Sequence, residues 1–326
     1  MTWLPSEPPR PPEPPRLLEP PSDLRVLASD LRFPEGPIAC TDGSLLVVEV
    51  RGGALTRISP DGRAHVVADL GGGPNGAAVG PDGAVYVCNN GGLPWSQLPD
   101  GSWYPFDPAT GSMQPPDYTH GWIERVDLET GLVDRIYQAA GDRELSAPND
   151  IAFDDAGTMW FTDTGKTTDR STVLGAVYGA AADGSSIVQV ARLLGPNGIA
   201  FLPDGSHVVV ADTPTGRVWS WSTATPDTDT PSLVGGGVLA SLPGPIALDS
   251  LAVDAMGRVV VALPGSGALA IIDGGGISLL PMPDPMPTNV CFGGAESDTA
   301  FVTLGGFGTV VAFRWPCPGA RLPFIV

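Results

Sequence analysis

Residues 81–90 read PDGAVYVCNN, a Pro-Asp-Gly turn followed by an apolar run. A turn of this kind beside an apolar run indicates a β-hairpin, because glycine supplies the positive φ that the turn needs. A similar turn and apolar strand recur five more times, at residues 41–50, 154–165, 203–213, 254–263 and 296–305. A short apolar strand precedes each copy, and two further strands follow most of them. Each repeat is therefore predicted to be a four-stranded antiparallel meander.

The spacing of the repeats indicates how they are assembled. The turn positions lie 40, 74, 48, 52 and 41 residues apart, at Gly43, Gly83, Gly157, Gly205, Gly257 and Asp298. Once one insertion is allowed, these intervals fit the roughly 40–50-residue period of β-propeller blades. The predicted fold is therefore all-β, a six-bladed β-propeller of four-stranded antiparallel blades.

The two ends of the chain are predicted to close the ring. Residues 23–31, DLRVLASDL, look like the outer strand of a repeat although they precede the first one. We expect this N-terminal outer strand to pair with the inner strands of the last repeat, around residues 289–313. Residues 1–22 contain nine prolines and are expected to form a disordered tail. Residues 23–326 then form one propeller domain.

The long second interval contains an insertion at about residues 91–120. It includes four large aromatic residues, Trp95, Trp103, Tyr104 and Phe106. An insertion in a propeller loop projects from one face of the ring, so two interpretations stay open. The insertion is either a plug that packs on its own loop or a lid over a substrate-binding mouth.

Composition excludes several classes of partner. The formal net charge of −19 argues against nucleic-acid binding, which needs clustered Lys and Arg. No segment resembles a signal peptide or a membrane helix of about 20 apolar residues. We therefore expect a cytoplasmic protein without a membrane or an evident protein partner. The four cysteines lack C-x-x-C spacing and are expected to be free thiols rather than a zinc site.

An oxygen-bearing side chain opens the innermost strand of every repeat. Five of these residues lie eight positions before the turn glycine, and the sixth takes the corresponding place: Glu35, Asn75, Asn149, Asn197, Asp249 and Asn289. Ring closure should bring all six to the same end of the central channel. Carboxylate and amide oxygens suit a hard cation such as Ca²⁺. The alternative interpretation is that these residues only cap turns.

Six sequence motifs that surround these positions resemble a known family. They are RFPEGP at 32–37, APND at 147–150, WFTDTG at 160–165, GPNGIAF at 195–201, LDSLAVD at 248–254 and TNVCFGG at 288–294. In this order and spacing the chain resembles the regucalcin, gluconolactonase and luciferin-regenerating-enzyme family from about residue 23 to 313. That family consists of metal-dependent six-bladed propellers, many of them lactonases.

The resemblance implies roles for the channel residues. Glu35, Asn197 and Asp249 look like direct ligands of one divalent cation, expected to be Ca²⁺ although Zn²⁺, Mn²⁺ or Mg²⁺ would also be compatible. Asn149 would complete the metal ligands or hold the reacting water or substrate, which makes it a catalytic candidate as well. Asp150 would contact substrate or support the ligands.

Further substrate contacts are expected from Asn75 and from Trp103 of the insertion. One departure from the family bears on specificity. Regucalcin-like members have an arginine that contacts sugar hydroxyls at the position where this chain has Ala147. The substrate is therefore expected to be a small lactone or ester, less polar than an aldonolactone.

The function expected from the resemblance is hydrolysis of a lactone by water that the cation activates. A cation at the channel mouth polarises a carbonyl and stabilises the oxyanion. Asp249 is the candidate general base. One alternative is a phosphotriester or fluorophosphate hydrolase on the same site. Another is a non-catalytic binding propeller with a structural metal, and a third is a metal-free strictosidine-synthase-like propeller.

Overall fold

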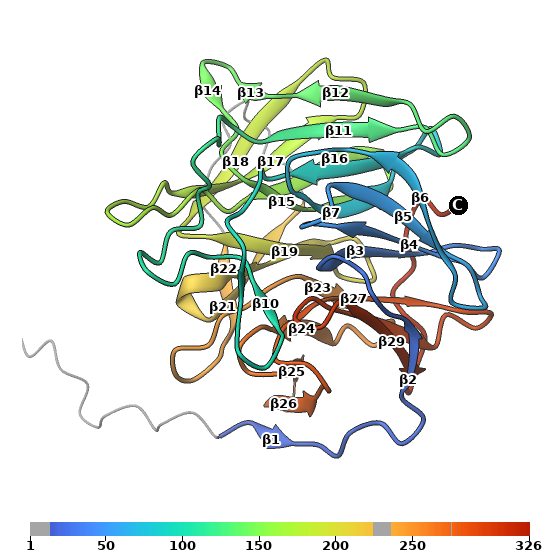
Figure 1. The fold of residues 1–326 in the computed structure, drawn as a ribbon. Helices are drawn as coiled ribbons and strands as arrows, with labels where there is room; N and C mark the ends of the chain where they lie inside the picture. The colour runs from blue at the N-terminus through green and yellow to red at the C-terminus, as the bar shows by residue number, and fades with distance from the viewer. Residues whose placement is uncertain (1–13, 224–235, 275) are drawn as a thin grey trace, which may run out of the picture.

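The computed structural model describes residues 14–223, 236–274 and 276–326. It contains six four-stranded antiparallel blades, which confirms the predicted all-β propeller (Figure 1). The innermost strands contact one another in sequence, and the sixth contacts the first, so that the ring is closed. No helix in these described ranges is long and apolar enough to cross a membrane.

The strands of each blade run from the axis outward in chain order. Blade one consists of β3 (Pro34–Ala39), β4 (Leu45–Glu49), β5 (Ala54–Ile58) and β6 (Ala64–Asp69). Blade two consists of β7 (Pro74–Val79), β8 (Val85–Asn89), β11 (Trp122–Val126) and β12 (Val133–Tyr137). Blade three consists of β15 (Pro148–Phe153), β16 (Thr158–Asp163), β17 (Gly175–Ala181) and β18 (Ile187–Leu193).

The second half of the chain repeats this arrangement. Blade four consists of β19 (Pro196–Phe201), β20 (His207–Asp212), β21 (Arg217–Ser222) and β22 (Gly237–Ser241), with the one-turn helix η1 (Thr213–Thr215) after β20. Blade five consists of β23 (Leu251–Val253), β24 (Val259–Leu263), β25 (Ala268–Asp273) and β26 (Gly276–Pro281). Blade six contains β27 (Pro287–Gly293), β28 (Thr299–Leu304) and β29 (Thr309–Arg314).

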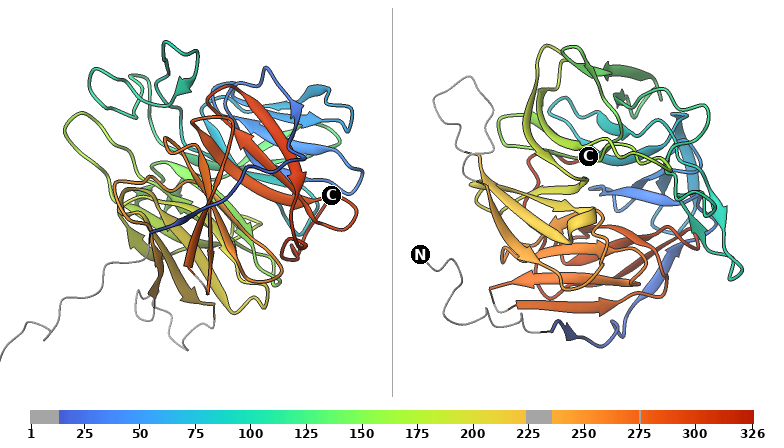
Figure 2. Two further views of the ribbon diagram at one scale, coloured as in Figure 1. Left: turned by 90° about the horizontal axis from the view of Figure 1, so that it is seen from below. Right: turned by 90° about the vertical axis from the view of Figure 1, so that its left-hand side faces the viewer.

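The outer strand of blade six comes from the other end of the chain. Strand β2 (Arg25–Ala28) pairs antiparallel with β29, with Arg25 opposite Ala312. The backbone N–H of Leu31 also donates to the carbonyl of Gly308 at 3.0 Å. This confirms the predicted closure, because β2 covers the sheet edge that the last repeat would otherwise expose. Figure 2 shows β2 lying beside the C-terminal strands.

Part of the proline-rich segment is also paired. Strand β1 (Arg16–Leu17) lies parallel to β26, with Arg16 opposite Ser278. Residues 14–22 thus differ from the expected disordered tail, since β1 forms a fifth strand on blade five. Residues 1–13, which hold the first prolines, lie outside the described residues.

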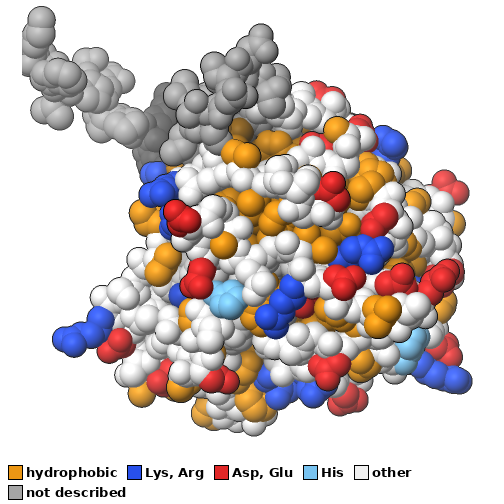
Figure 3. Space-filling model, turned by 90° about the horizontal axis from the view of Figure 1, so that it is seen from above, with side chains coloured by type: hydrophobic (Ala, Val, Ile, Leu, Met, Phe, Trp, Pro, Cys, Tyr) orange, Lys and Arg blue, Asp and Glu red, His pale blue; other side chains and the backbone are white. Residues whose placement is uncertain are grey.

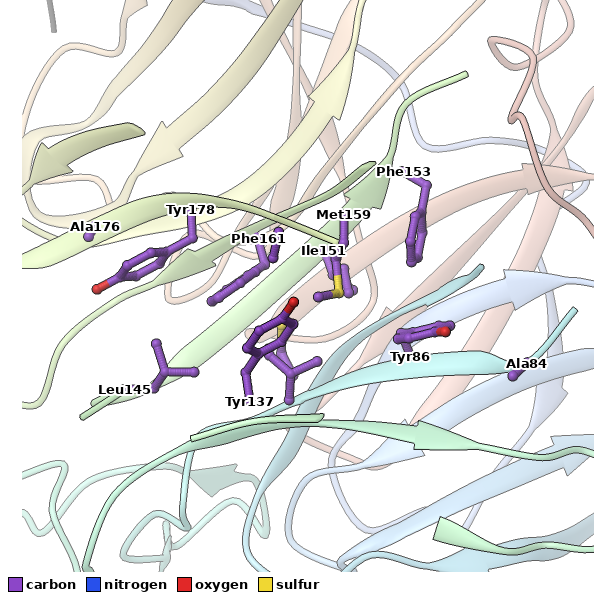
Figure 4. Packing of buried hydrophobic residues seen from close by; sticks show 13 residues of the cluster. Ala84, Tyr86, Tyr137, Leu145, Ile151, Phe153, Met159, Phe161, Ala176 and Tyr178 are labelled. Atoms are coloured by element: carbon purple, nitrogen blue, oxygen red, sulfur yellow. The ribbon is translucent and has the colours of Figure 1, made fainter. Parts of the chain in front are cut away.

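The core lies between neighbouring blades. Figure 4 shows one such layer, in which Tyr86 of blade two lies beside Phe153 of blade three, and Tyr137 of blade two lies toward Phe161 and Tyr178 of blade three. The rings of Phe161 and Tyr178 stack with centroids 5.1 Å apart. Every residue of the second strands β4, β8 and β24 is buried, as expected for sheets covered on both faces. The blades are therefore rigid supports for side chains near the axis.

The outer surface carries scattered charges. On the face drawn in Figure 3, Asp and Glu side chains alternate with Arg and with apolar side chains, and no basic patch is visible.

Candidate metal centre

The innermost strands depart from regular pairing at the predicted site positions. In β15 and β19 the pairing register shifts across Asn149 and Asn197. A similar shift lies next to Glu35 in β3 and across Asn75 in β7. In blade five the ladder of β23 begins only after Asp249. A bulge re-aims the side chain that it releases from the ladder, so these residues are free to face the channel.

Glycines after two of these positions let the innermost strands approach each other closely. Gly36 has φ +51°, and a Cβ atom there would lie 2.6 Å from the carbonyl oxygen of Asn75. A Cβ atom on Gly198 would lie 2.5 Å from the backbone nitrogen of Leu251. Any side chain at either place would push neighbouring blades apart. The E-G and N-G pairs of the sequence therefore set how narrow the channel is.

A cavity of about 460 Å³ lies at this end of the channel. All four predicted metal ligands line it, namely Glu35, Asn149, Asn197 and Asp249, and so does Asn75. These residues come from five different blades and from positions up to 214 residues apart in the chain. The structure thus brings the predicted constellation together at the floor of one cavity.

Glu35 is held by several donors. Its Oε2 accepts hydrogen bonds from the backbone N–H of Gly36 and from Nδ2 of Asn289, the latter at 2.7 Å. The hydroxyl of Ser250 donates to Oε1 at 3.2 Å. Burial raises the pKa of Glu35 well above its usual value, and the nearby carboxylate of Asp249 raises it further. A cation next to Glu35 would favour the ionised form of this carboxyl group, which burial and Asp249 disfavour.

Asp249 and Asp150 are two further acidic groups of the centre. Burial raises the pKa of Asp249 to about 7, opposed by a hydrogen bond from the Asn197 amide. Burial also raises the pKa of Asp150 to about 7. The carboxylate of Asp150 accepts from the backbone N–H groups of Ile151 and Ile199, at 2.9 and 3.3 Å. Three carboxyl groups therefore share a buried region in which none is neutralised by Lys or Arg in the interactions described.

Two amide oxygens of the centre have no protein partner. Oδ1 of Asn149 and Oδ1 of Asn197 are buried, and neither accepts a hydrogen bond. Buried polar atoms without a partner are rare and call for an explanation such as an ion or water. A cation facing both oxygens would satisfy them and would reduce the repulsion between Glu35 and Asp249. The residues present therefore fit a hard divalent cation.

The donor set also limits the kind of metal. Within the described part of the chain, no group of three or more His, Cys, Asp or Glu residues could hold a metal ion. A site here must use the amide oxygens of Asn149 and Asn197 beside the carboxylates. All-oxygen ligands favour Ca²⁺ or Mg²⁺ over zinc.

Three other predicted site residues lie away from the cavity lining. Asn289 does not line the cavity but supports it, since its amide donates to Glu35 and its Oδ1 accepts from the N–H of Val290 at 2.7 Å. Asp150 is not among the residues that line the cavity, and its carboxylate accepts from backbone N–H groups, which suits the expected supporting role; direct contact with substrate stays a prediction. The expected substrate contact of Trp103 also stays a prediction. Its ring lies under the Arg51 guanidinium, 4.0 Å away, and does not line the cavity.

The insertion joins β8 to β11 and contains the small hairpin β9 (Ser96–Gln97) and β10 (Trp103–Tyr104). It reaches over neighbouring blades rather than packing only on itself. The ring of Trp95 lies 4.8 Å from that of Phe33 in blade one, and the N–H of Trp103 donates to the carbonyl of Gly306 at 2.9 Å. Five of its residues line the cavity and form what we call the insertion wall: Leu93, Tyr104, Pro105, Phe106 and Met113.

Sequence reasoning missed Lys166, which is the single lysine of the 326-residue chain. It follows β16, lines the cavity and is only 3% exposed. Its Nζ donates to the carbonyl of Gly92 at 2.6 Å and to that of Met113 at 3.4 Å. Burial lowers its pKa to about 7. The signal that could have found it is its uniqueness in so acidic a sequence.

The sequence of this chain is similar to those of known proteins. Residues 33–306 match the profile of the SMP-30/gluconolactonase/LRE-like region. A gluconolactonase of Zymomonas mobilis is 24% identical over 86% of this chain and 78% of its own. A diisopropyl-fluorophosphatase of Loligo vulgaris is 28% identical over 55% of this chain, which spans 60% of that relative.

The fold comparison agrees. The structure of a gluconolactonase from Xanthomonas campestris superposes with a TM-score of 0.68 at 23% identity, covering 90% of this chain and 89% of its own. The profile match extends over most of the propeller and includes the residues that line the cavity floor. The chain therefore belongs to the SMP-30/gluconolactonase/LRE-like family.

Proposed function

We propose that this protein is a hydrolase that opens a lactone or a similar ester with the help of one divalent cation, Ca²⁺ by preference. The observation that carries the proposal is the cavity floor. There, two buried carboxylates and two amide oxygens without partners face one space large enough for a small molecule. Family membership and the gluconolactonase relative support hydrolysis as the reaction.

Glu35, Asn149, Asn197 and Asp249 would hold the cation. When bound, it would supply Lewis-acid chemistry by polarising the ester carbonyl and stabilising the developing oxyanion. Glu35 would serve as the anchor, because three protein donors fix its carboxylate. Asn289 and Ser250 act as positioning residues through Glu35.

Asp249 would act as the general base. Its carboxylate lines the cavity, where it can accept a proton from water that attacks the carbonyl carbon. Without a cation, burial raises its pKa to about 7, and a bound cation would favour the ionised form that a base needs at neutral pH. The proton would then pass to the departing alkoxide of the opened ring. Asn149 and Asn75 are placed to orient the substrate beside it.

One other activity has specific support. The diisopropyl-fluorophosphatase relative favours hydrolysis of a phosphofluoridate or phosphotriester on the same floor. Such a reaction would use the same carboxylates and amide oxygens, so only assays separate the two activities. If the protein is instead a binding propeller whose metal is structural, it should hydrolyse neither lactones nor phosphofluoridates nor phosphotriesters.

The test begins with metal analysis of the purified protein. Proton release is then followed on a panel of lactones, aryl esters and a dialkyl fluorophosphate, before and after dialysis against EGTA and after Ca²⁺ is restored. We expect one equivalent of metal and lactone hydrolysis that is lost on dialysis and recovered with Ca²⁺. Full lactonase activity in the metal-stripped protein would rule out the proposed mechanism, and activity on the fluorophosphate alone would favour the second candidate.

A further inference from the structure

The cavity changes in character between its floor and its mouth. The acidic and amide groups lie at the floor, whereas apolar side chains of the insertion wall, with Phe33, Leu194 and Met286, line much of the rest of the cavity, and Met113 and Leu194 among them lie at its exposed mouth. In the described part of the chain, the charged residues that line it are only Glu35, Asp249 and Lys166. A ligand that reaches the floor must therefore pass along an apolar surface.

Some of this apolar surface is exposed to water. Met113 is 38% exposed and Leu194 is 50% exposed, although each lines the cavity. Covering apolar surface is favourable in proportion to the area removed from water. These side chains, from the insertion and from the end of blade three, are therefore suited to an apolar group of a ligand.

The polar groups around the mouth are mostly engaged with the protein itself. The hydroxyl of Thr213 donates to the carbonyl of Leu248 at 2.6 Å, and that of Thr164 donates to the carbonyl of Ala147 at 3.2 Å. Oδ1 of Asn90 accepts from the N–H of Gly92 at 2.9 Å. These groups are less available to the hydroxyl groups of a sugar ring, which would lose hydrogen bonds to water on entering.

Lys166 holds the insertion wall in place. Its two carbonyl partners, Gly92 and Met113, stand at the two ends of the stretch that carries the wall, 21 residues apart in sequence. Its Nζ also lies 5.0 Å from the centre of the Tyr118 ring, within the same insertion. The N–H of Met113 donates to the carbonyl of Thr167 at 2.9 Å, next to the lysine. One buried side chain thus ties both ends of the wall to blade three.

We propose that the cavity selects lactones that carry an apolar alkyl or aryl substituent, and that Lys166 is the positioning residue for this specificity. The substituent packs against the insertion wall while the lactone ring lies over the polar floor. The inference rests on the proposed lactonase function but concerns a different part of the cavity.

The experiment measures kcat/KM of the Ca²⁺-loaded enzyme on γ-lactones with side chains of increasing length, and on glucono-δ-lactone. We expect kcat/KM to rise by up to about fourfold for each added methylene until the cavity is filled. Binding of the matching γ-alkyl lactams, which resist hydrolysis, is measured by calorimetry and should show the same dependence on chain length. This second readout does not depend on catalysis.

Variants then locate the effect. Phe106→Ser and Met113→Gln should flatten the dependence on chain length, whereas the exposed Gln97→Ser in the same insertion should leave it unchanged. Lys166→Met keeps an apolar chain of similar length but removes both hydrogen bonds. It should raise KM for long-chain lactones several-fold more than KM for γ-butyrolactone. A merely structural role would lower activity on all lactones alike.

The outcomes distinguish a failure of the apolar substrate preference from a failure of the proposed lactonase function. A flat series, or a preference for glucono-δ-lactone, overturns the inference even though the enzyme is a lactonase. If no lactone is hydrolysed but long-chain lactams still bind more tightly, the proposed function fails while the apolar ligand site stands. If Lys166→Met does not fold, the two wall variants decide the question.

Discussion

Glu35 and Asp249 are both buried acids of one centre, but their surroundings differ. Both oxygens of Glu35 accept hydrogen bonds, from Gly36, Asn289 and Ser250. Asp249 lines the cavity and takes a side-chain hydrogen bond from Asn197. Both carboxyl groups line the cavity, but Glu35 is held by more donors, so Glu35 is better suited to anchoring a cation and Asp249 to exchanging a proton with a substrate.

This difference predicts different results for two conservative substitutions. Glu35→Gln should weaken Ca²⁺ affinity, and excess Ca²⁺ should restore much of kcat. Asp249→Asn should also weaken Ca²⁺ binding but should stay about 10²–10⁴-fold slower at saturating metal, because an amide cannot accept the proton. Calorimetric titration with Ca²⁺ and proton-release kinetics give both quantities. Recovery of near wild-type kcat by Asp249→Asn in excess Ca²⁺ would show that the base is another group.

Lys166 provides a second prediction, on pH and stability. Burial lowers its pKa to about 7, whereas an unfolded lysine titrates near about 10.4. The folded state therefore pays for a buried ammonium at pH below about 7, and this penalty fades as the pH rises from about 7 toward 10. Relative to Lys166→Met, the wild type should gain stability over that range, by up to about 1.4 kcal/mol per pH unit.

Denaturant unfolding of the two proteins at several pH values between 6.5 and 9.5 measures this trend. Substitution of Arg192 by Met serves as the control, because it removes a cationic side chain that is exposed rather than buried. A stability difference between wild type and Lys166→Met that is independent of pH would contradict the lowered pKa.

The position of a residue within its repeat was enough to predict which side chains meet at the axis. Glu35 and Asp249 are 214 residues apart, yet both hold the same position in their repeats. The position of Asp150 could not be read in the same way, because a bulge decides whether its side chain lines the cavity or turns behind it. The positions of Trp103 and Lys166 relative to the cavity depend on how the insertion folds onto the blades. The insertion has no repeat pattern, so the spacing of the repeats does not predict this.

Among the elements, the terminal strands β1 and β2 contribute unequally to the ring. β2 adds the fourth strand of blade six, and the segment near it buries Ala28 and Leu31 in the core. β1 adds a two-residue edge strand on blade five, where Leu17 remains 72% exposed. β2 covers an otherwise open sheet edge and part of the core, whereas β1 covers little apolar surface.

Truncation should reveal this difference. Removal of residues 1–22 should lower the melting temperature only slightly, since it removes β1 and its short pairing. Removal of residues 1–31 should cost about 3 kcal/mol or more and promote association, because it uncovers β29 and leaves the site of Leu31 empty. Differential scanning calorimetry and light scattering measure both effects. Equal melting temperatures for the two truncations would contradict the proposed role of β2 in closure.

Elements with a repeated pattern were predictable, and those without one were not. The residues of the turn before β8 and of its five counterparts are typical of β-hairpins, and they were enough to predict the blades. β1 is two residues long and pairs parallel to a distant strand, so no local pattern announces it. The insertion could be located by the long interval, but its contacts with Phe33 and Gly306 come from tertiary packing.

For the whole molecule, the candidate metal centre is a junction between blades. Glu35 belongs to blade one, Asn149 to blade three and Asn197 to blade four, while Asp249 precedes the first strand of blade five. A cation held by all four would link four of the six blades at the axis. Without it, the same residues leave like charges and unpaired oxygens there, which destabilise the ring as a whole.

Removal of the cation should therefore lower the stability of the entire propeller. A ligand that binds only the folded state adds about 4 kcal/mol when its concentration is a thousand times Kd. We expect EGTA to lower the melting temperature of the wild type and Ca²⁺ to restore it. Hydrogen exchange should quicken first in β3, β15, β19 and the segment before β23, whose side chains meet at the axis, and less in the outer strands.

Glu35→Gln makes this prediction specific to the charges at the axis. In EGTA the variant should melt above the wild type, because it no longer buries an ionisable carboxyl group beside Asp249, where burial and the neighbouring acid disfavour the charged form. In saturating Ca²⁺ it should melt below the wild type, because the cation has lost an anionic ligand. The order of the two melting temperatures should thus reverse when metal is added. If the substitution shifts the melting temperature in the same direction under both conditions, Glu35 does not face a cation and the axis is held together by hydrogen bonds alone.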